Sequence, residues 1–235
     1  MSEHVWGTAP DFVGPRHELR ERLLLDLFLS AGPGPEVLNA GAGQGTLSQR
    51  LAELGFEVTS TDLSPEAVSL LQERATGEVV EADLTSLPFP DASFDAAVLG
   101  EVLEHIEDDR AALTEVARVL RSEGVLALSV PANPKLYGPS DSWAGHVRRY
   151  TRPELLEACT ATGFTVVCCV GWGFPMSRLY HRHVYERYLH RRGPVQPTRG
   201  HGPLVALVGA LLQLDRIFVG VERGALGYLA LATRR

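Results

Sequence analysis

The sequence predicts an α/β fold: a doubly wound, mostly parallel seven-stranded sheet with a leading helix and a helical insertion before the last strand. Short apolar runs alternate with amphipathic segments along the chain, and turns rich in Gly and Pro separate them. The 235 residues suffice for one large domain with a substantial core. The best apolar run is interrupted by polar residues and falls short of the roughly 18 to 20 residues that span a bilayer.

Each element follows from the spacing of apolar side chains. Apolar residues recur at helical spacing over 16–30, until Gly32-Pro33-Gly34-Pro35 stops the pattern. Strands are expected at 36–40, 56–61, near 79, 94–99, 124–130, 164–170 and 228–233. Helices are expected at 46–54, 65–74 and 109–120, and another begins at Thr151, a good N-cap with Pro in the first turn.

Composition narrows the class of protein. The net charge of -7 and the pI of about 5.6 weaken a nucleic-acid-binding interpretation. Cys159, Cys168 and Cys169 are odd in number and clustered, which does not resemble a secreted disulfide framework. The first residues show no signal-peptide pattern, so we expect a cytoplasmic protein.

A glycine turn and a downstream carboxylate point to a nucleotide-bearing ligand. Val37-Leu-Asn-Ala-Gly-Ala-Gly-Gln-Gly45 places three glycines at alternate positions between a strand and a helix, where backbone can approach a ligand closely. Asp62 follows the second strand roughly 20 residues later, where a carboxylate can accept hydrogen bonds from ribose hydroxyls. Ser64 before Pro65 supplies the cap of the next helix, which leaves Asp62 for the ligand.

The Gly-x-Gly-x-Gly spacing resembles motif I of class I S-adenosylmethionine-dependent methyltransferases of the small-molecule, type 11-like group, with their Rossmann-like sheet. Further segments extend the resemblance over about 36–170: Glu81-Ala-Asp83-Leu84, Leu87 to Asp95, Gly100-Glu-Val-Leu-Glu-His105, and Arg118 to Gly124. The cofactor that it implies is S-adenosyl-L-methionine. The cofactor-binding residues that we predict are Asn39, Gly41, Gly43, Gly45, Asp62, Leu63, Asp83, Leu84, Gly100, Glu101 and Arg16.

One position departs from the family pattern. Asn39 stands where the family usually carries Asp or Glu, a carboxylate that organises contacts to the methionine ammonium. Glu101 could compensate from the mouth of the crevice. Arg16 and Arg20, one helical turn apart, could pair the methionine carboxylate, or they could be solvated charges on a helix face.

Methyl transfer to a hydroxyl needs alignment and a proton acceptor, for which histidine is the natural candidate. His105 follows the fourth strand, and His146 lies in the loop 131–150; these are the two candidate catalytic bases. Trp143, Arg148 and Tyr150 in the same loop are candidate substrate residues, although ordinary loop contacts explain Arg148 slightly better. The histidines at 181, 183 and 190 do not share a face, and no metal site is predicted.

We divide the single domain 1–235 into a leading-helix cap (1–35), a cofactor-binding core (36–170), a helical insertion (174–222) and a last strand (225–235). The insertion comprises an aromatic helix, a basic hinge at 191–202 and an apolar helix from Leu204 to about Val221. That helix is apolar on nearly every side and must be buried. Burial against its own domain ranks first, a homodimer second and a membrane surface third.

The resemblance implies methylation of a small-molecule acceptor, on oxygen or nitrogen, in bacterial secondary metabolism. Two alternatives remain: an NAD-dependent oxidoreductase, which also uses a glycine turn and a downstream acid, and a catalytically silent regulator that binds the cofactor. The glycine spacing opposes the first, and only Asn39 hints at the second.

Overall fold

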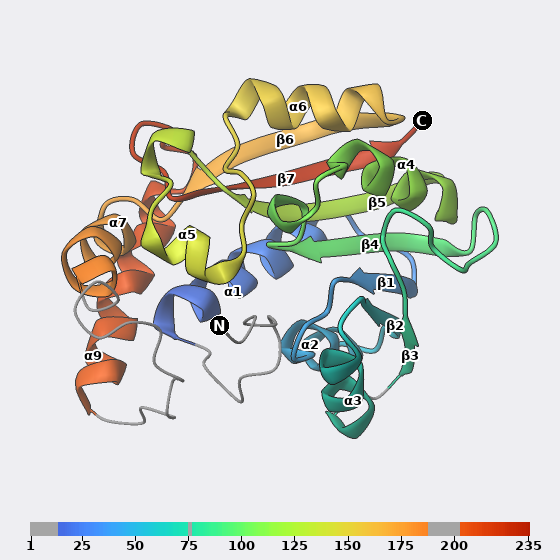
Figure 1. The fold of residues 1–235 in the computed structure, drawn as a ribbon, viewed down its shortest axis with the longest axis horizontal. Coiled ribbons are helices and arrows are strands. Elements are labelled where there is room, and N and C mark those ends of the chain that lie inside the picture. Colours follow the sequence, from blue (N-terminus) through green and yellow to red (C-terminus); the bar gives the residue numbers. More distant parts are fainter. Residues whose placement is uncertain (1–13, 75–76, 188–202) are drawn as a thin grey trace.

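The structure is a computed structural model, and it describes residues 14–74, 77–187 and 203–235. Its strands form one seven-stranded sheet in the order β3-β2-β1-β4-β5-β7-β6 (Figure 1). The bounds are β1 Glu36–Ala40, β2 Glu57–Asp62, β3 Glu78–Glu81, β4 Phe94–Gly100, β5 Leu120–Pro131, β6 Phe164–Trp172 and β7 Gly227–Arg234. β7 pairs antiparallel with β5 and β6, and the other pairings are parallel. The predicted fold class is confirmed.

Helices cover both faces of the sheet (Figure 1). The helices α4 (Asp109–Val119) and α6 (Arg152–Ala161) pack on one face, and α1 (Pro15–Ser30) and α2 (Thr46–Glu53) pack on the other. The strand β4 shows why both faces need cover: Ala97 and Leu99 belong to the first core cluster, Ala96 and Val98 to the second. Such continuous apolar runs are typical of a parallel strand buried on both sides.

Two predicted helix starts are confirmed by their caps. The Thr151 side chain accepts from the Glu154 amide, and the Glu154 carboxylate accepts from the Thr151 amide at 2.8 Å. At α3 (Pro65–Arg74), the Ser64 hydroxyl accepts from the Ala67 amide at 3.3 Å. Ser64 therefore caps α3, as the sequence predicts.

The segment 131–150 contains more structure than the predicted loop. It holds a 3-10 turn η2 (Pro134–Leu136) and the helix α5 (Pro139–Ala144), which starts at Pro139 and ends at Gly145 in the left-handed conformation. The strand β5 also starts earlier than predicted, because Leu120 pairs with Phe94 across an irregularity in the ladder. The helix α5 matters for function because it carries Asp141 and Trp143.

The insertion begins with α7 (Met176–Tyr180), which continues into a π-helical turn η3 (His181–Tyr185). Its second part is α9 (Pro203–Leu212), followed by the 3-10 segment η4 (Gln213–Phe218). The predicted basic hinge at 191–202 lies outside the described residues. The fully buried Asp215 joins the two parts, because its carboxylate accepts from the amides of Met176 and Ser177 at 2.7 Å each.

The predicted burial of the apolar helix against its own domain is wrong for most described residues. Leu212 is buried in the core cluster of α1, but α9 and η4 touch the domain along one side only. The large apolar residues that they leave exposed are Val205, Leu207, Leu211, Leu214, Ile217 and Phe218. A second subunit and a membrane surface stay predictions. No helix within the described ranges is long and apolar enough to cross a membrane.

Candidate functional site

A cavity of about 730 Å³ opens at the carboxyl ends of the parallel strands, between the glycine turn on one side and α5 and α7 on the other. Open α/β sheets bind ligands at this edge. All but one of the predicted cofactor residues line the cavity: Arg16, Asn39, Gly41, Gly43, Asp62, Leu63, Asp83, Leu84, Gly100 and Glu101. Gly45 does not line it.

The backbone of the glycine turn explains this difference. Gly41, Gly43 and Gly45 all have positive φ, at 69°, 53° and 81°. A Cβ on Gly43 would meet no atom within 4 Å, whereas one on Gly45 would lie 2.8 Å from Leu71 Cδ2. Gly43 therefore keeps open the space where the cavity meets the backbone, and Gly45 allows the turn into α2 to pack against α3.

Asp62 holds the turn in place. Its Oδ2 accepts from the Gly43 amide at 2.8 Å, and its Oδ1 accepts from the Ser64 amide at 3.0 Å. Each carboxylate oxygen can accept more than one hydrogen bond, so the Asp62 carboxylate can still accept from a ligand in the cavity. At the end of β3, Asp83 makes a similar turn, with Oδ1 accepting from the amide and hydroxyl of Thr85 at 2.8 Å each.

Glu101 supplies a carboxylate oxygen with no partner. The residue directly follows β4 with a φ of 61°, and its amide donates to the Ser129 carbonyl at 3.0 Å. Its Oε1 is buried and makes no hydrogen bond within the described chain. Asn39 lies nearby on β1, where Nδ2 donates to the Ser48 hydroxyl at 2.8 Å. A buried carboxylate oxygen without a donor suits a ligand cation such as an ammonium.

The two arginines of α1 lie in different surroundings. Arg20 Nη1 lies 3.5 Å from Glu101 Oε2. Arg16 instead donates from Nη1 to Nδ1 of His181 at 2.6 Å, and its guanidinium lies 5.1 Å from the centre of the Tyr185 ring. Of the two, only Arg20 forms an ion pair with Glu101 among the described residues.

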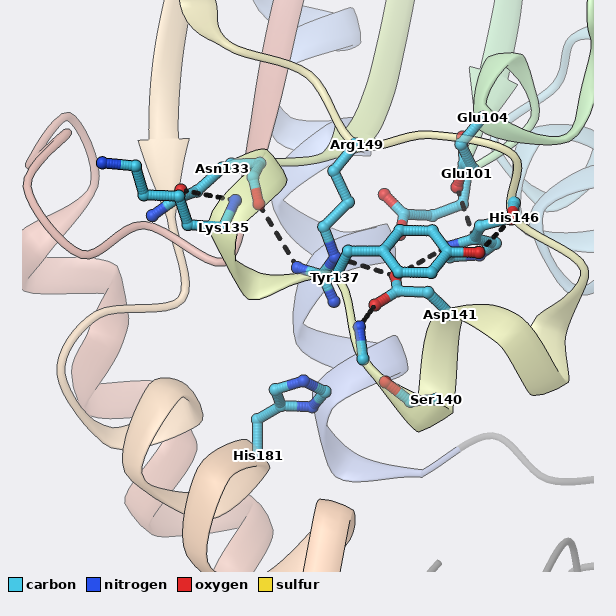
Figure 2. A network of polar contacts seen from close by, with 12 residues as sticks. Glu101, Glu104, Asn133, Lys135, Tyr137, Ser140, Asp141, His146, Arg149 and His181 are labelled. Atoms are coloured by element: carbon cyan, nitrogen blue, oxygen red, sulfur yellow. Dashed lines mark hydrogen bonds and ion pairs between the residues drawn. The ribbon is translucent and has the colours of Figure 1, made fainter.

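The two candidate bases lie together in the cavity. The rings of His105 and His146 meet edge to face, with centroids 4.7 Å apart. His146 Nδ1 bonds to Asp141 Oδ1 at 2.9 Å (Figure 2). Burial, followed by the charge on His146, lowers the pKa of His105 to about 4. His105 is therefore neutral at pH 7 and a weak base, whereas a carboxylate orients His146.

Asp141 and Arg149 also line this cavity; the sequence places them among the polar residues of the loop 131–150, without a specific role for either. Arg149 Nε donates to Asp141 Oδ1 at 2.8 Å, so one carboxylate oxygen joins the arginine and His146 (Figure 2). Burial alone would raise the pKa of Asp141, but hydrogen bonds from His146 and Arg149 outweigh it and lower the pKa to about 2. The spacing Asp141-x₄-His146 does not by itself predict this pair. The pair depends on α5, which carries Asp141 and ends just before His146.

Glu104 is a second missed residue. It is fully buried, and neither carboxylate oxygen makes a hydrogen bond within the described chain. Burial, then the charge on Glu101, raises its pKa well above the ordinary value. Ligand-type atoms of Glu104, His105 and His146 lie within 4.8 Å of one another, so this group could share a cation, which the sequence analysis did not predict.

The predicted substrate residues separate in the structure. Trp143 lines the cavity, but Arg148 and Tyr150 do not. Both bind Asp109 instead: the Tyr150 hydroxyl donates to Asp109 Oδ2 at 2.7 Å, and Arg148 Nη1 pairs with the same atom at 3.0 Å. The substrate role predicted for Arg148 and Tyr150 is therefore corrected to attachment of the loop, since a buried Tyr hydroxyl needs such a partner.

Comparison with known proteins finds similarity to methyltransferases. Residues 38–128 match the family model described as a methyltransferase domain. A Mycobacterium tuberculosis protein named as an S-adenosylmethionine-dependent methyltransferase is 34% identical over 139 residues, covering 58% of this chain and 51% of that protein. A ubiquinone biosynthesis O-methyltransferase of Xanthomonas campestris is 37% identical over 132 residues, covering 53% and 55%. Each match thus spans about half the length of the relative.

Among solved structures, an S-adenosylmethionine-dependent methyltransferase from Mesorhizobium loti has the same fold. The two superpose with a TM-score of 0.65 and 19% sequence identity, over 94% of this chain and all of that one (100%). The similarity of fold therefore extends beyond residues 38–128, the segment that the family model matches.

Proposed function

We propose that this chain, which carries a class I S-adenosylmethionine-dependent methyltransferase domain, transfers a methyl group to a hydroxyl of a small acceptor. The observation that carries the proposal is the Asp141–His146 pair, which lines the same cavity as the glycine turn and Asp62. A cofactor-binding site alone would not need an oriented base. The pair also favours an enzyme over a silent regulator, and oxygen over nitrogen as the methylated atom.

The residues of the cavity fit the cofactor group by group. Asp62 would accept from the ribose hydroxyls, and Asp83 from the adenine amino group, with Leu63 and Leu84 beside the ring. The unpartnered Oε1 of Glu101 would accept from the methionine ammonium and replace the charge that Asn39 lacks.

The methionine carboxylate is joined to the same carbon atom as the ammonium, so it would lie near Glu101. Arg20 is the arginine beside Glu101 and would bind this carboxylate. Of the two arginines predicted for this carboxylate, Arg20 would keep the role, which leaves Arg16 for another ligand.

The bound cofactor supplies a sulfonium-activated methyl group, so the protein needs to align the acceptor oxygen and remove its proton. With Nδ1–H donated to Asp141, Nε2 of His146 presents a lone pair. His146 would take the hydroxyl proton there, and Asp141 would stabilise the resulting imidazolium. His105 would orient the acceptor, because its lowered pKa makes it a weak base.

The finer assignment, a metabolite of bacterial secondary metabolism, rests on the resemblance of the loop Gly145 to Thr151 to bacterial small-molecule methyltransferases. The names of similar proteins are consistent with small acceptors, since one is a ubiquinone biosynthesis O-methyltransferase. For this chain the acceptor itself stays a proposal.

Calorimetry with S-adenosylmethionine, S-adenosylhomocysteine and NAD is the first test. We expect the first two to bind and NAD not to bind; preferential NAD binding would overturn the proposal. Turnover is then measured over a panel of hydroxylated and aminated metabolites, with labelled cofactor. Methylation of amines alone would contradict the role of the histidine base.

Turnover measured in the presence of a chelator distinguishes a histidine base from a required metal ion. If Glu104, His105 and His146 held a required cation, EDTA would abolish turnover and a divalent cation would restore it. Turnover that persists in EDTA supports His146 as the base.

A further inference from the structure

We infer that the acceptor carries an anionic group, a carboxylate or a group of like charge and shape, and that Arg16 binds it beside His181 and Tyr185. The inference rests on the proposed function, because it names the class of molecule that the methyltransferase accepts. Arg16 lines the cavity from α1, and His181 and Tyr185 line it from η3.

The first step is the charge state of the pair. Burial, followed by the charges of Arg16 and Arg149, lowers the pKa of His181 to about 3. His181 is therefore neutral at pH 7, and its Nδ1 accepts the hydrogen bond from Arg16 Nη1 at 2.6 Å. Its other nitrogen, Nε2, lies 3.3 Å from Glu186 Oε1, which fixes the proton on that side of the ring.

The second step is the orientation of Arg16. His181 takes one of its donors, and the Tyr185 ring lies 5.1 Å from the guanidinium carbon. The rings of His181 and Tyr185 are themselves stacked, with centroids 5.7 Å apart. These contacts fix the orientation of the planar guanidinium, as recognition of a carboxylate by two parallel hydrogen bonds requires.

The third step is the missing counter-ion. The other two arginines that line the cavity each have a carboxylate partner: Arg20 pairs with Glu101, and Arg149 with Asp141. Within the described chain Arg16 makes no ion pair, and its polar contact is to a neutral imidazole. A partly buried cation without an anion costs free energy that a bound anion recovers. Among the described residues that line the cavity, Arg16 is therefore the cation best placed to bind an anionic group of a ligand.

The fourth step is the rest of the acceptor. Trp143 and Tyr180 line the cavity together with Tyr185, so a flat apolar body suits it. The acceptor class is then an aromatic or similarly apolar hydroxy acid, with its anion at Arg16 and its hydroxyl at His146.

The test uses matched acids and amides. Binding of ortho-, meta- and para-hydroxybenzoate to the full chain loaded with S-adenosylhomocysteine is compared with binding of the corresponding hydroxybenzamides. We expect at least one acid to bind about tenfold tighter than its amide, since a hydrogen-bonded charge pair contributes about that factor. The preference should disappear in Arg16→Gln, shrink in Arg16→Lys, and persist in Arg22→Gln, an exposed arginine of the same helix.

The outcomes are distinguishable. If no acid binds more tightly than its amide while S-adenosylhomocysteine still binds, the inference is overturned and the proposed function stands. If Arg16→Gln instead weakens S-adenosylhomocysteine binding and leaves the acid preference intact, Arg16 serves the cofactor and the inference is again overturned. If Arg16→Gln does not fold, the Arg16→Lys comparison decides. Failure of the wild-type protein to bind S-adenosylhomocysteine contradicts the proposed function instead.

Discussion

Nδ1 of His146 and Oδ1 of Asp141 lie 2.9 Å apart, joining the end of α5 to the loop that follows it. The same carboxylate oxygen receives Arg149 Nε at 2.8 Å. An oriented imidazole at a cavity that fits a methyl donor is what a hydroxyl methyltransferase needs, and the first prediction follows from this pair.

Replacing His146 by Gln should lower kcat by about a hundredfold or more, because a positioned general base contributes that much. Affinity for S-adenosylhomocysteine should not change. Asp141→Asn should show a smaller loss, and His183→Gln, at an exposed histidine, should show none. Initial rates with saturating cofactor measure the effect. Full activity of His146→Gln together with a large loss in His105→Gln would assign the base to His105 instead.

Replacing Asp62 by Ala should weaken cofactor binding tenfold to about a hundredfold, since a charged acceptor is lost from a partly buried cleft. The same change removes the acceptor of the Gly43 and Ser64 amides, so part of the loss comes from the turn itself. Asp62→Asn keeps one acceptor oxygen, so its affinity for the cofactor should lie between those of the wild type and Asp62→Ala. Calorimetric titration with S-adenosylhomocysteine is the measurement, and an unchanged dissociation constant in Asp62→Ala refutes the ribose assignment.

Replacing Gly43 by Val should abolish cofactor binding, because the branched side chain would enter open space beside the turn. Gly32 offers a matched control: its φ of 61° resembles the 53° of Gly43, and a Cβ there also meets nothing within 4 Å. Gly32→Val should therefore carry a similar backbone cost without affecting binding. Equal binding by the two variants would place the ligand elsewhere.

Replacing Glu104 by Gln should make the protein more stable, and the gain should grow as pH rises from 5 to 8. Burial and the charge of Glu101 raise the pKa of Glu104 in the folded state. Ionisation then favours the unfolded chain at pH values above the ordinary pKa of 4.5, and Gln lacks this penalty. Urea unfolding at several pH values tests the trend, with the exposed Glu53→Gln as control. A gain that is the same at pH 5 and pH 8 contradicts the raised pKa.

Ionised Asp141 stabilises the folded protein, so its protonation at low pH should lower the free energy of unfolding. Its folded-state pKa of about 2 lies below the ordinary value of 3.8, so its contribution is complete above pH 4 and is lost as pH falls toward 2. The shift corresponds to about 2 kcal/mol. The stability difference between wild type and Asp141→Asn, measured by urea unfolding between pH 5 and pH 2.5, should therefore shrink as pH falls.

The sequence by itself determined the sheet, the glycine turn and most of the cofactor side of the cavity. These features depend on local chemistry: short apolar runs that predict buried strands, a positive φ that glycine adopts without strain, and residues that directly follow strands which must end at the same edge. The cap at Ser64, which frees Asp62, could also be predicted, because capping acts over three residues.

Only the tertiary structure decided the acceptor side. Arg16 meets His181, and Tyr150 meets Asp109, across 165 and 41 positions of sequence. No local pattern encodes such pairs, because they depend on how α1, the loop 131–150 and the insertion pack over the sheet. The same reason explains why Arg148 and Tyr150 were misassigned, why Glu104 and Asp141 were missed, and why the apolar face of α9 proved exposed. Burial and charge pairing are properties of the packed chain, and they decide which polar residues of a loop bind a ligand and which attach the loop.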